Sequence, residues 1–303
     1  MATVDRSLAA LSLRLSATLG GIFEPHPSMR IHGGCINDCF RWESSNGPLF
    51  VKIADATQLA MLEAEAESLR ELDAANAVRV PTVLGSGAVE NGSFLALEWI
   101  ELDSASAPVQ AQLGAQLARQ HRVSATRFGW SRNNTIGSTE QVNPWCDDWG
   151  TFFREHRLRF QLQLAQRNGH AGRLQESGSR LLERVADLMG DHRPAPSLLH
   201  GDLWSGNVGA DTSGAPVIFD PAVYFGDREA DLAMTRLFGG FSREFYAAYE
   251  DAWPLPPSAS QRVDLYNLYH VLNHLNLFGT GYLGQAQALI DRLLAQASRS
   301  SGT

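Results

Sequence analysis

The sequence contains few cysteines and no long apolar run, and both shortages narrow the class of protein. Only three cysteines occur in 303 residues, Cys35, Cys39 and Cys146, and their irregular spacing does not fit a disulfide framework or a zinc site. No stretch reaches the roughly 18 uninterrupted apolar residues that a membrane span needs. The segment Met1–Gly20 carries charged residues among its apolar positions and is more typical of an amphipathic helix than of a signal peptide. We therefore expect a cytoplasmic protein that makes no contact with a membrane.

Positive charge is also in short supply. The sequence has 25 Lys and Arg residues against 33 Asp and Glu residues, which gives a formal net charge of −8. A nucleic-acid binder normally carries a basic stripe, so we expect no nucleic-acid partner. A local basic site for phosphate stays possible, because net charge does not describe a single pocket. The 44 % of hydrophobic residues is ordinary for a globular chain that is long enough for one large or two modest domains.

The first hundred residues combine short β-type segments with one strong helix signal. The segment Gln58–Ala75 is rich in Ala, Leu and Glu, which are good helix formers. The turn Ser45-Asn46-Gly47-Pro48 separates two of the β-type segments and carries the Asn-Gly signal of a hairpin. The predicted strands are Ser28–Ile31, Cys39–Glu43, Leu49–Ile53, Val80–Leu84 and Phe94–Glu98.

From Ala107 onward long helical segments dominate, and only Val217–Phe219 interrupts them with β character. The predicted helices are Val109–His121, Trp149–Arg167, Ala171–Met189, Arg243–Trp253 and Val263–Phe278. The sequence thus predicts an α+β protein with two lobes. Residues 1–100 would form a small β-rich, nucleotide-binding lobe with one helix, and residues 101–303 a larger, mostly helical lobe that binds substrate.

One segment of the second lobe combines the residue types that phosphoryl transfer requires. It is His200-Gly201-Asp202-Leu203-Trp204-Ser205-Gly206-Asn207, followed by Phe219-Asp220-Pro221. A kinase needs a carboxylate beside the attacking hydroxyl, an amide oxygen for a metal ion, and a second carboxylate that joins the metal to the phosphates. Asn207 follows Asp202 by five residues and Asp220 follows Asn207 by thirteen, the intervals of the protein-kinase catalytic loop and metal-binding aspartate. These residues predict a kinase of the protein-kinase-like fold.

The same pattern assigns roles to the individual residues. Asp202 would be the catalytic base, while His200 would brace the loop through hydrogen bonds. Turns rich in Asp, Asn and Gly also occur without any chemistry, so a purely capping role for Asp202 remains the alternative. Lys52, inside an otherwise apolar strand, would contact the α- and β-phosphates. Of the three glutamates in the following helix, we choose Glu65 as the partner of Lys52.

Three further features would complete the nucleotide site. Gly33 and Gly34 lie between the first two strands, where backbone N–H groups can approach phosphate oxygens. Cys35 beside them is a candidate redox thiol, although an inert turn residue is an equal alternative. Glu98 and Ile100 fit the hinge whose main chain meets adenine. His270 and His274 are four residues apart, but we interpret them as structural because no third metal ligand is evident.

Motifs along nearly the whole chain resemble the fructosamine (ketosamine) kinase family, which is related in fold to the aminoglycoside phosphotransferases. The resemblance runs from about Gly33 to Tyr282 and includes the catalytic-loop residue Trp204. The residues that carry it are Phe128–Trp130, Asn134–Gly137, Gln141–Trp145, Asp148–Trp149, His200–Asn207, Asp220–Met234, Leu237–Phe241 and Leu268–Asn276.

The resemblance implies ATP-dependent phosphorylation of the 3-hydroxyl of a ketosamine, such as fructosyl- or ribulosyl-lysine, with release of the amine afterwards. In that reaction Asp202 is the base, Asn207 and Asp220 hold Mg²⁺, and Lys52 with Glu65 positions the phosphates of ATP. Trp204 would offer an aromatic face to the substrate amine. Arg228 and Asp231 are expected to brace the catalytic loop rather than to touch substrate.

Two other functions stay open at this point. The first is a phosphotransferase of the aminoglycoside, choline or homoserine kinase type, and the second is a nucleotide-binding pseudokinase scaffold. The preferred sugar stays open as well, because ribose- and glucose-derived ketosamines differ by little more than one hydroxymethyl-type unit. So does the amine, which is either a small metabolite or a glycated lysine on a protein. For the oligomeric state we expect a monomer or a weak homodimer.

Overall fold

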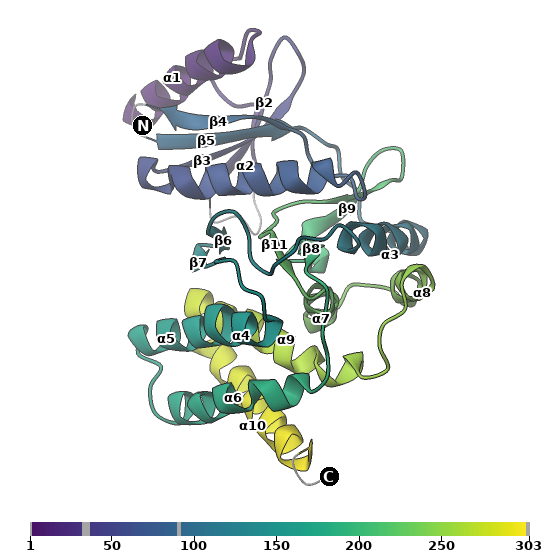
Figure 1. Ribbon diagram of the computed structural model, residues 1–303. Coiled ribbons are helices and arrows are strands. Elements are labelled where there is room, and N and C mark those ends of the chain that lie inside the picture. The colour runs from purple at the N-terminus through teal and green to yellow at the C-terminus, as the bar shows by residue number, and fades with distance from the viewer. Residues whose placement is uncertain (1, 32–36, 90–91, 301–303) are drawn as a thin grey trace. The chain divides into compact units, whose positions relative to one another are not determined.

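A computed structural model describes residues 2–31, 37–89 and 92–300 (Figure 1). The predicted site residues Gly33, Gly34 and Cys35 lie outside the described residues. The chain divides into two compact units, each discontinuous in sequence. Unit 1 is made of Met1–Val109 with Val208–Asp220, and unit 2 of Gln110–Asn207 with Pro221–Thr303.

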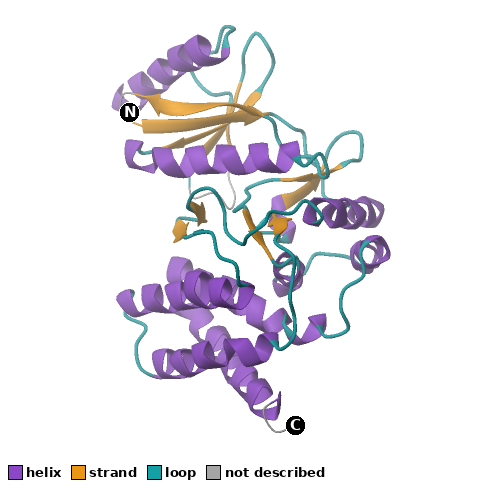
Figure 2. Cartoon of the chain, in the orientation of Figure 1, coloured by secondary structure: helices purple, strands orange, loops and turns teal. Residues whose placement is uncertain are grey.

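Unit 1 is built on a five-stranded antiparallel sheet with the strand order β1-β2-β3-β5-β4. Figure 2 shows these strands together with the two helices of this part of the chain. The strands are β1 (Met29–Ile31), β2 (Asp38–Trp42), β3 (Leu49–Ala54), β4 (Val83–Val89) and β5 (Gly92–Glu98). The helices are α1 (Ala2–Leu19) and α2 (Leu59–Ala74), and a 3₁₀ turn, Ala56–Gln58, precedes α2.

The two helices cover opposite faces of this sheet, because successive side chains of a strand point to opposite sides. Val51 of β3 packs in a core with Leu11 and Leu15 of α1, whereas the neighbouring Lys52 contacts Glu65 of α2. The sequence therefore buries one apolar face under α1 and turns its single strand lysine toward α2.

A short hairpin from later in the chain completes unit 1. Strands β9 (Val208–Ala210) and β10 (Pro216–Ile218) pair antiparallel. Bridges join Val217 to Arg79 and Ala210 to Asp103. Through this hairpin Asp220, predicted as a metal ligand, joins the same unit as Lys52.

Unit 2 is mostly helical, as predicted. Its helices are α3 (Ala107–His121), α4 (Trp149–Phe153), α5 (Phe160–Arg167), α6 (Arg173–Met189), α7 (Glu229–Leu237), α8 (Arg243–Ala252), α9 (Val263–Phe278) and α10 (Leu283–Ser300). A π-helical turn, Arg154–Arg159, joins α4 to α5, and 3₁₀ turns lie at Ser205–Asn207, Ala259–Gln261 and Thr280–Tyr282. Two small antiparallel pairs accompany the helices, β6 (Asn134–Ile136) with β7 (Thr139–Gln141) and β8 (Ser197–Leu199) with β11 (Tyr224–Gly226).

Helix α9 is the centre of this unit. It packs against α5, α7 and α10, and α10 also packs against α6. Ten of its residues between Leu265 and Leu275 are buried. A helix that is buried on all sides lies inside a core, which explains the central position of α9.

The α+β class and the β-rich first part followed by a helical part are confirmed. The strand predicted at Val80–Leu84 instead begins at Val83, because Pro81 has no N–H for the ladder. The helix predicted at Trp149–Arg167 is one run that widens to a π-helical turn in its middle. Helices α7 and α10 were not predicted. Among the described residues, every helix is too short or too polar to cross a bilayer.

Candidate active site

A buried ion cluster lies on the α2 side of the sheet in unit 1. Nζ of Lys52 lies 2.7 Å from Oε1 of Glu65 and 2.7 Å from Oδ1 of Asp220. Lys52 is only 4 % exposed. Burial by itself lowers the pKa of Lys52, but the charges of Asp220 and Glu65 overcome it and raise the pKa well above its usual value. The ammonium is therefore a fixed positive charge, as a phosphate ligand must be.

The structure selects one of the three glutamates that the sequence offered on α2. Glu65 contacts Lys52, and its carboxylate is largely buried. Burial raises the pKa of Glu65, while the charge of Lys52 acts in the opposite direction. The cluster holds two carboxylates and one ammonium, so a further cation would balance its charge. Lys52 is also the only lysine among the 25 Lys and Arg residues of the chain.

Asp220 has an unusual backbone conformation. Its φ angle is 55°, in the left-handed region that non-glycine residues rarely occupy. Such backbone strain persists where the surrounding structure fixes it, and it is concentrated at functional sites. The side chain keeps 34 % of its surface exposed even while it contacts Lys52. One carboxylate oxygen thus holds the lysine, and the rest of the group can accept another ligand.

The predicted hinge residues lie at the end of β5 and just beyond it, with Glu98 as the last residue of the strand. The carboxylate of Glu98 accepts hydrogen bonds from Arg79 and from the backbone N–H of Thr82, so this side chain has a structural role in unit 1. Arg79 also forms an ion pair with Asp211, whose pKa is lowered to about 2 by hydrogen bonds from the Ser213 side chain and the Ala215 backbone and, to a lesser extent, by Arg79. Ile100 lies in the loop beyond β5. Because the Glu98 side chain is used in this way, the adenine contact predicted for this segment would be made by its main chain.

One carboxylate, that of Asp231, holds the catalytic-loop segment 200–207 in unit 2. Asp231 on α7 accepts hydrogen bonds from the backbone N–H of His200 at 2.7 Å and of Gly201 at 2.9 Å. Burial tends to raise the pKa of Asp231, but hydrogen bonds and nearby charges, led by His121, lower it. The ionised carboxylate is thus available to hold the loop, which is the bracing role predicted for Asp231.

Within the loop, hydrogen bonds orient the predicted functional side chains. The N–H of Asp202 donates to Nδ1 of the buried His200 at 3.3 Å, consistent with a bracing histidine. Nδ2 of Asn207 donates to the carbonyl oxygen of Asp202 at 2.9 Å. This bond uses the nitrogen end of the amide and leaves Oδ1 of Asn207 as the group for a metal ion. Oxygen ligands of this kind suit Mg²⁺.

Trp204 lies with other aromatic side chains at the edge of the catalytic loop. Its ring covers Gly206 so closely that a Cβ atom there would overlap the indole. Phe238 meets the indole edge-on with the ring centres 6.2 Å apart, and His274 follows at 4.8 Å from Phe238. Phe238 is 39 % exposed. The loop thus has a partly exposed aromatic wall that starts two residues from Asp202. The segment after Phe238 approaches this loop closely at Gly240. Only glycine fits there, because its φ is 93° and a Cβ atom would overlap Ser205.

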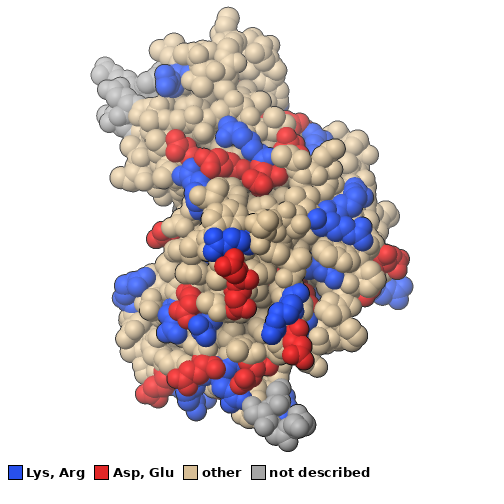
Figure 3. Space-filling model, in the orientation of Figure 1, with Lys and Arg blue, Asp and Glu red and all other residues tan. Residues whose placement is uncertain are grey.

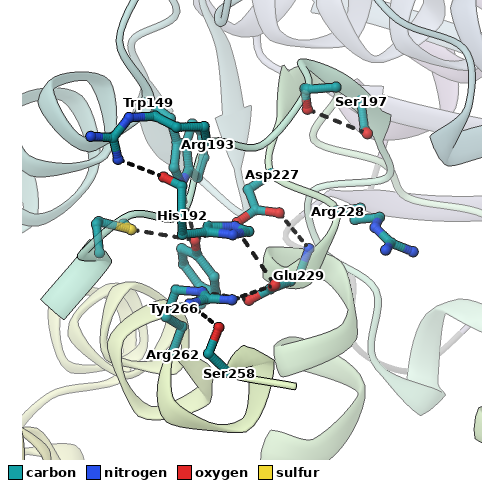
Figure 4. Close-up of polar contacts among 12 residues, drawn as sticks. Trp149, His192, Arg193, Ser197, Asp227, Arg228, Glu229, Ser258, Arg262 and Tyr266 are labelled. Carbon is teal, nitrogen blue, oxygen red and sulfur yellow. Dashed lines mark hydrogen bonds and ion pairs between the residues drawn. The ribbon is translucent and has the colours of Figure 1, made fainter. Parts of the chain in front are cut away.

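A second ion cluster, shown in Figure 4, lies at the start of α7. Nε2 of His192 lies 2.7 Å from Asp227, and Tyr266 donates to the same carboxylate at 2.5 Å. Arg262 holds both oxygens of Glu229 at 2.7 and 2.8 Å. The ligand atoms of His192, Asp227 and Glu229 lie within 4.8 Å of one another, close enough for a metal ion. However, Arg262 and Tyr266 already satisfy both carboxylates, so we interpret the cluster as structural.

This cluster anchors the helix that holds the catalytic loop. Oδ1 of Asp227 accepts a hydrogen bond from the N–H of Glu229, at the first residue of α7, and Asp231 follows on the same helical turn. Arg228 does not brace the catalytic loop as expected. Instead its guanidinium stacks on Trp253 at 3.8 Å and donates to the carbonyl of Pro254, beyond the end of α8.

On the face drawn in Figure 3, acidic and basic side chains are interspersed.

The β-sheet of unit 1 with its Lys–Glu–Asp cluster and the aspartate-bearing loop of unit 2 define a kinase of the protein-kinase-like class. Two aminoglycoside phosphotransferase APH(4)-Ia structures agree with this fold, with TM-scores of 0.63 and 0.64 at 16 and 17 % identity. The family is shown by sequence: the model of the fructosamine kinase family matches residues 8–296. The chain belongs to the fructosamine kinase family.

Individual relatives support the same family. The chain is 44 % identical over 285 residues to the "Probable ketoamine kinase" of Synechocystis sp., covering 94 % of this chain and 96 % of that protein. It is 42 % identical over 267 residues to the chloroplastic protein-ribulosamine 3-kinase of Oryza sativa subsp. indica, covering 87 and 78 % of the two chains. A crystal structure of a candidate fructosamine-3-kinase from Haemophilus somnus has a TM-score of 0.86 at 29 % identity, covering 94 and 97 %.

Proposed function

We propose that the protein transfers the γ-phosphoryl group of ATP to the 3-hydroxyl of a ketosamine, with fructosyl-lysine and ribulosyl-lysine as representative substrates. The observation that carries the proposal is the ion cluster of Lys52, Glu65 and Asp220, together with the hydrogen-bonded loop that presents Asp202. A scaffold that only bound nucleotide would have no chemical need for the base, the amide ligand and the carboxylate ligand together. Membership of the fructosamine kinase family supports the choice of acceptor.

In the proposed reaction each charged residue has one task. The sugar O3 forms a bond to the γ-phosphorus while the bond between that phosphorus and the β,γ-bridging oxygen breaks, and ADP leaves. The hydroxyl proton passes to the carboxylate of Asp202. A sugar hydroxyl is a weak acid, so Asp202 mainly orients it and accepts the proton late. Lys52, held protonated by Asp220 and Glu65, places positive charge on the α- and β-phosphates. Alignment and charge neutralisation supply most of the rate gain.

The residues present fit a magnesium ion as well. Oδ1 of Asn207 and the exposed part of the Asp220 carboxylate are hard oxygen donors, which Mg²⁺ prefers. We propose that these two residues hold Mg²⁺. When bound, the ion neutralises the negative charge of the phosphate oxygens.

For the acceptor, the aromatic wall offers the matching chemistry. A ketosamine carries a protonated secondary amine next to its sugar, and a cation above an aromatic face gains about 0.5–2 kcal/mol. Trp204 and the partly exposed Phe238 supply such faces beside the loop of Asp202. We propose that Trp204 contacts the amine side of the substrate. The amine would belong either to a free metabolite or to a glycated lysine of a protein.

The test is ATP turnover with Mg²⁺ on fructosyl-lysine and ribulosyl-lysine, followed by the site of phosphorylation in the product. Asp202→Asn should abolish turnover, whereas Asp251→Asn, the same substitution at an exposed position of α8, should leave it intact. Turnover with aminoglycosides or choline but with neither ketosamine would replace the proposed acceptor. Binding of ATP without turnover on any of these compounds would support a scaffold instead.

A further inference from the structure

The β6–β7 hairpin of unit 2 carries buried amide side chains. Asn134 and Gln141 face each other across the two strands, and both are at least 95 % buried, as is the nearby Asn143. Burying an amide side chain is unfavourable unless its donors and acceptors are all used. The hydrogen bonds of these three residues therefore indicate what the hairpin does.

The bonds fix the orientation of each amide. Oδ1 of Asn134 accepts from Nε2 of Gln141 and from Nδ2 of Asn143, both at 2.9 Å. The remaining end of Asn134, Nδ2, must then be the donor, and it donates to the carbonyl oxygen of Val223 at 2.8 Å. Nε2 of Gln141 also donates to the carbonyl oxygen of Ala222 at 3.0 Å. Two neighbouring carbonyl groups are thus held by two amides whose alternative orientation would place oxygen against oxygen.

Ala222 is also attached to the catalytic loop. Its N–H donates to the carbonyl oxygen of His200 at 2.8 Å. The next loop residue, Gly201, has a φ of 84°, and a Cβ atom there would overlap the carbonyl of Ala222. The Ala222 peptide therefore packs directly on the loop two residues before Asp202, with Gln141 holding its carbonyl group from the other side. In sequence, Ala222 follows Asp220 by two residues.

The buried cation Arg157 is hydrogen-bonded to the amide network of the hairpin. Arg157 is completely buried in the π-helical turn, with its guanidinium 4.1 Å from the ring centre of Tyr224. Nη2 donates to Oδ1 of Asn143 at 2.7 Å. On the other side of the pair, the hydroxyl of Tyr269 donates to Oε1 of Gln141 at 2.8 Å. Arg157, through Asn143, and Tyr269 thus fix the position of the amide pair relative to the packed helices of unit 2.

We propose that Asn134 and Gln141 are positioning residues of the kinase reaction, which hold the Ala222–Val223 backbone and through it the catalytic loop with Asp202. They would act on alignment for phosphoryl transfer and not on nucleotide affinity. The inference rests on the proposed kinase function. It assigns a task to the hairpin motif Asn134–Gly137 and Gln141–Asn143, which the phosphate, metal and acceptor residues leave unused.

The test uses two isosteric substitutions in the full chain, Gln141→Glu and Asn134→Asp. Each keeps the size of the side chain and replaces the donor that faces a carbonyl group with an oxygen. We expect kcat to fall by about 10- to 100-fold while KM for ATP stays within about twofold, since small misplacement of reacting groups lowers the chemical step. Glu140→Gln, a neighbouring exposed position on the same strand, is the matched control and should keep wild-type kcat.

Two outcomes of the kinetics would overturn the proposal. One is a wild-type kcat in both variants. The other is a loss of kcat that only follows the loss of folded protein, measured by circular dichroism at the assay temperature, so that the folded fraction retains full turnover.

Hydrogen–deuterium exchange of the same variants separates this inference from the choice of acceptor, because it needs no substrate. In Gln141→Glu, we expect peptides covering residues 199–207 and 219–226 to exchange about tenfold faster, while peptides from α10 keep wild-type rates. Unchanged exchange of both peptides would reject the link from the hairpin to the loop, even for a protein with no activity on ketosamines.

Discussion

Oδ1 of Asp220 lies 2.7 Å from Nζ of Lys52, although 168 residues separate the two in the sequence. The contact is made because the β9–β10 hairpin belongs to the same unit as the N-terminal sheet. The strained backbone of Asp220 and the elevated pKa of Lys52, which Asp220 and Glu65 raise against the effect of burial, both occur at this point. The ammonium is thus the group on which the charge balance of the cluster depends.

Replacing that ammonium with an apolar group of similar length should stop the reaction. In Lys52→Met, we expect kcat to fall on the order of 10²- to 10³-fold, as for the loss of one fixed positive or hydrogen-bonding group at developing charge. Steady-state turnover on ribulosyl-lysine measures the loss. Arg173→Met, which removes an exposed ion pair with Asp291, serves as the control. A Lys52→Met protein with more than about a tenth of wild-type kcat would contradict the role of Lys52 in the reaction.

The same variant should show a pH-dependent loss of stability. Without Lys52, burial keeps the pKa of Glu65 above its unfolded value with no cation to oppose it. A carboxyl group whose pKa is higher in the folded state favours folding only while it is protonated. The stability deficit of Lys52→Met should therefore be small near pH 4 and should grow as the pH rises toward 8. Thermal unfolding at several pH values measures it, and a deficit that shrinks with rising pH would be the opposite of the expected sign.

Most residues of the candidate site could be predicted from local sequence patterns, because they lie in short segments. The spacing of Asp202, Asn207 and Asp220 could be recognised from the sequence, and the contact of Lys52 with Glu65 matches the glutamate chosen there. The contacts that hold the loop could be only partly predicted. Both Asp231 and Arg228 were expected to brace it. Asp231 does so, whereas Arg228 stacks on Trp253, a residue 25 positions away.

What could not be predicted depends on contacts between distant segments. The amides of Asn134 and Gln141 have ordinary spacing in sequence, and their role follows only from the carbonyl groups of Ala222 and Val223 more than 80 positions later. The same is true of the cluster that joins His192 to Asp227 in Figure 4. The grouping of Asn134, Gln141 and Asn143 around one short segment is the sequence signal that could have indicated such a network.

His270 in the core of unit 2 should contribute to acid unfolding. Burial lowers the pKa of His270 from 6.5 to about 3, so the folded state holds the neutral imidazole. Its contribution to stability is present above the unfolded pKa of about 6.5 and is lost as the pH falls from there toward 3, at up to about 1.4 kcal/mol per pH unit. His270→Leu should flatten the stability profile between pH 6.5 and 4 in urea titrations. Phe278→Leu, an exposed position on the same helix, should keep the wild-type slope, and an equally steep slope in both variants would argue against His270.

The aromatic wall predicts that a change at Trp204 alters KM for the ketosamine but not KM for ATP. Trp204→Ala should raise KM for the ketosamine by about tenfold, in line with the loss of a cation–π contact, and leave KM for ATP unchanged. Gly206→Ala should produce a similar change, because the new methyl group would displace the indole that covers this position. Trp145→Ala is the matched control, since this tryptophan is 40 % exposed but packs beside Phe225. Equal effects on the KM of ATP and of the ketosamine would remove Trp204 from the acceptor site.

The single lysine of the chain leads to a prediction about the protein's own chemistry. Reducing sugars form ketosamines on unprotonated amines, and Lys52 carries the single side-chain amine of the sequence, because the other 24 of its 25 Lys and Arg residues are arginines. Lys52 is buried and ion-paired, with its pKa raised well above 10.5, so almost none of it is a free nucleophile. Incubation of the folded protein with ribose should therefore leave Lys52 unmodified and the turnover intact.

In urea the same treatment should add a sugar to Lys52, detected by mass spectrometry of the peptide that contains it. A variant with arginines Arg173 and Arg299 changed to lysine should acquire adducts at those positions in the folded state. Ribose adducts on Lys52 in the folded wild type would show that the amine is accessible, contrary to the ion cluster described above.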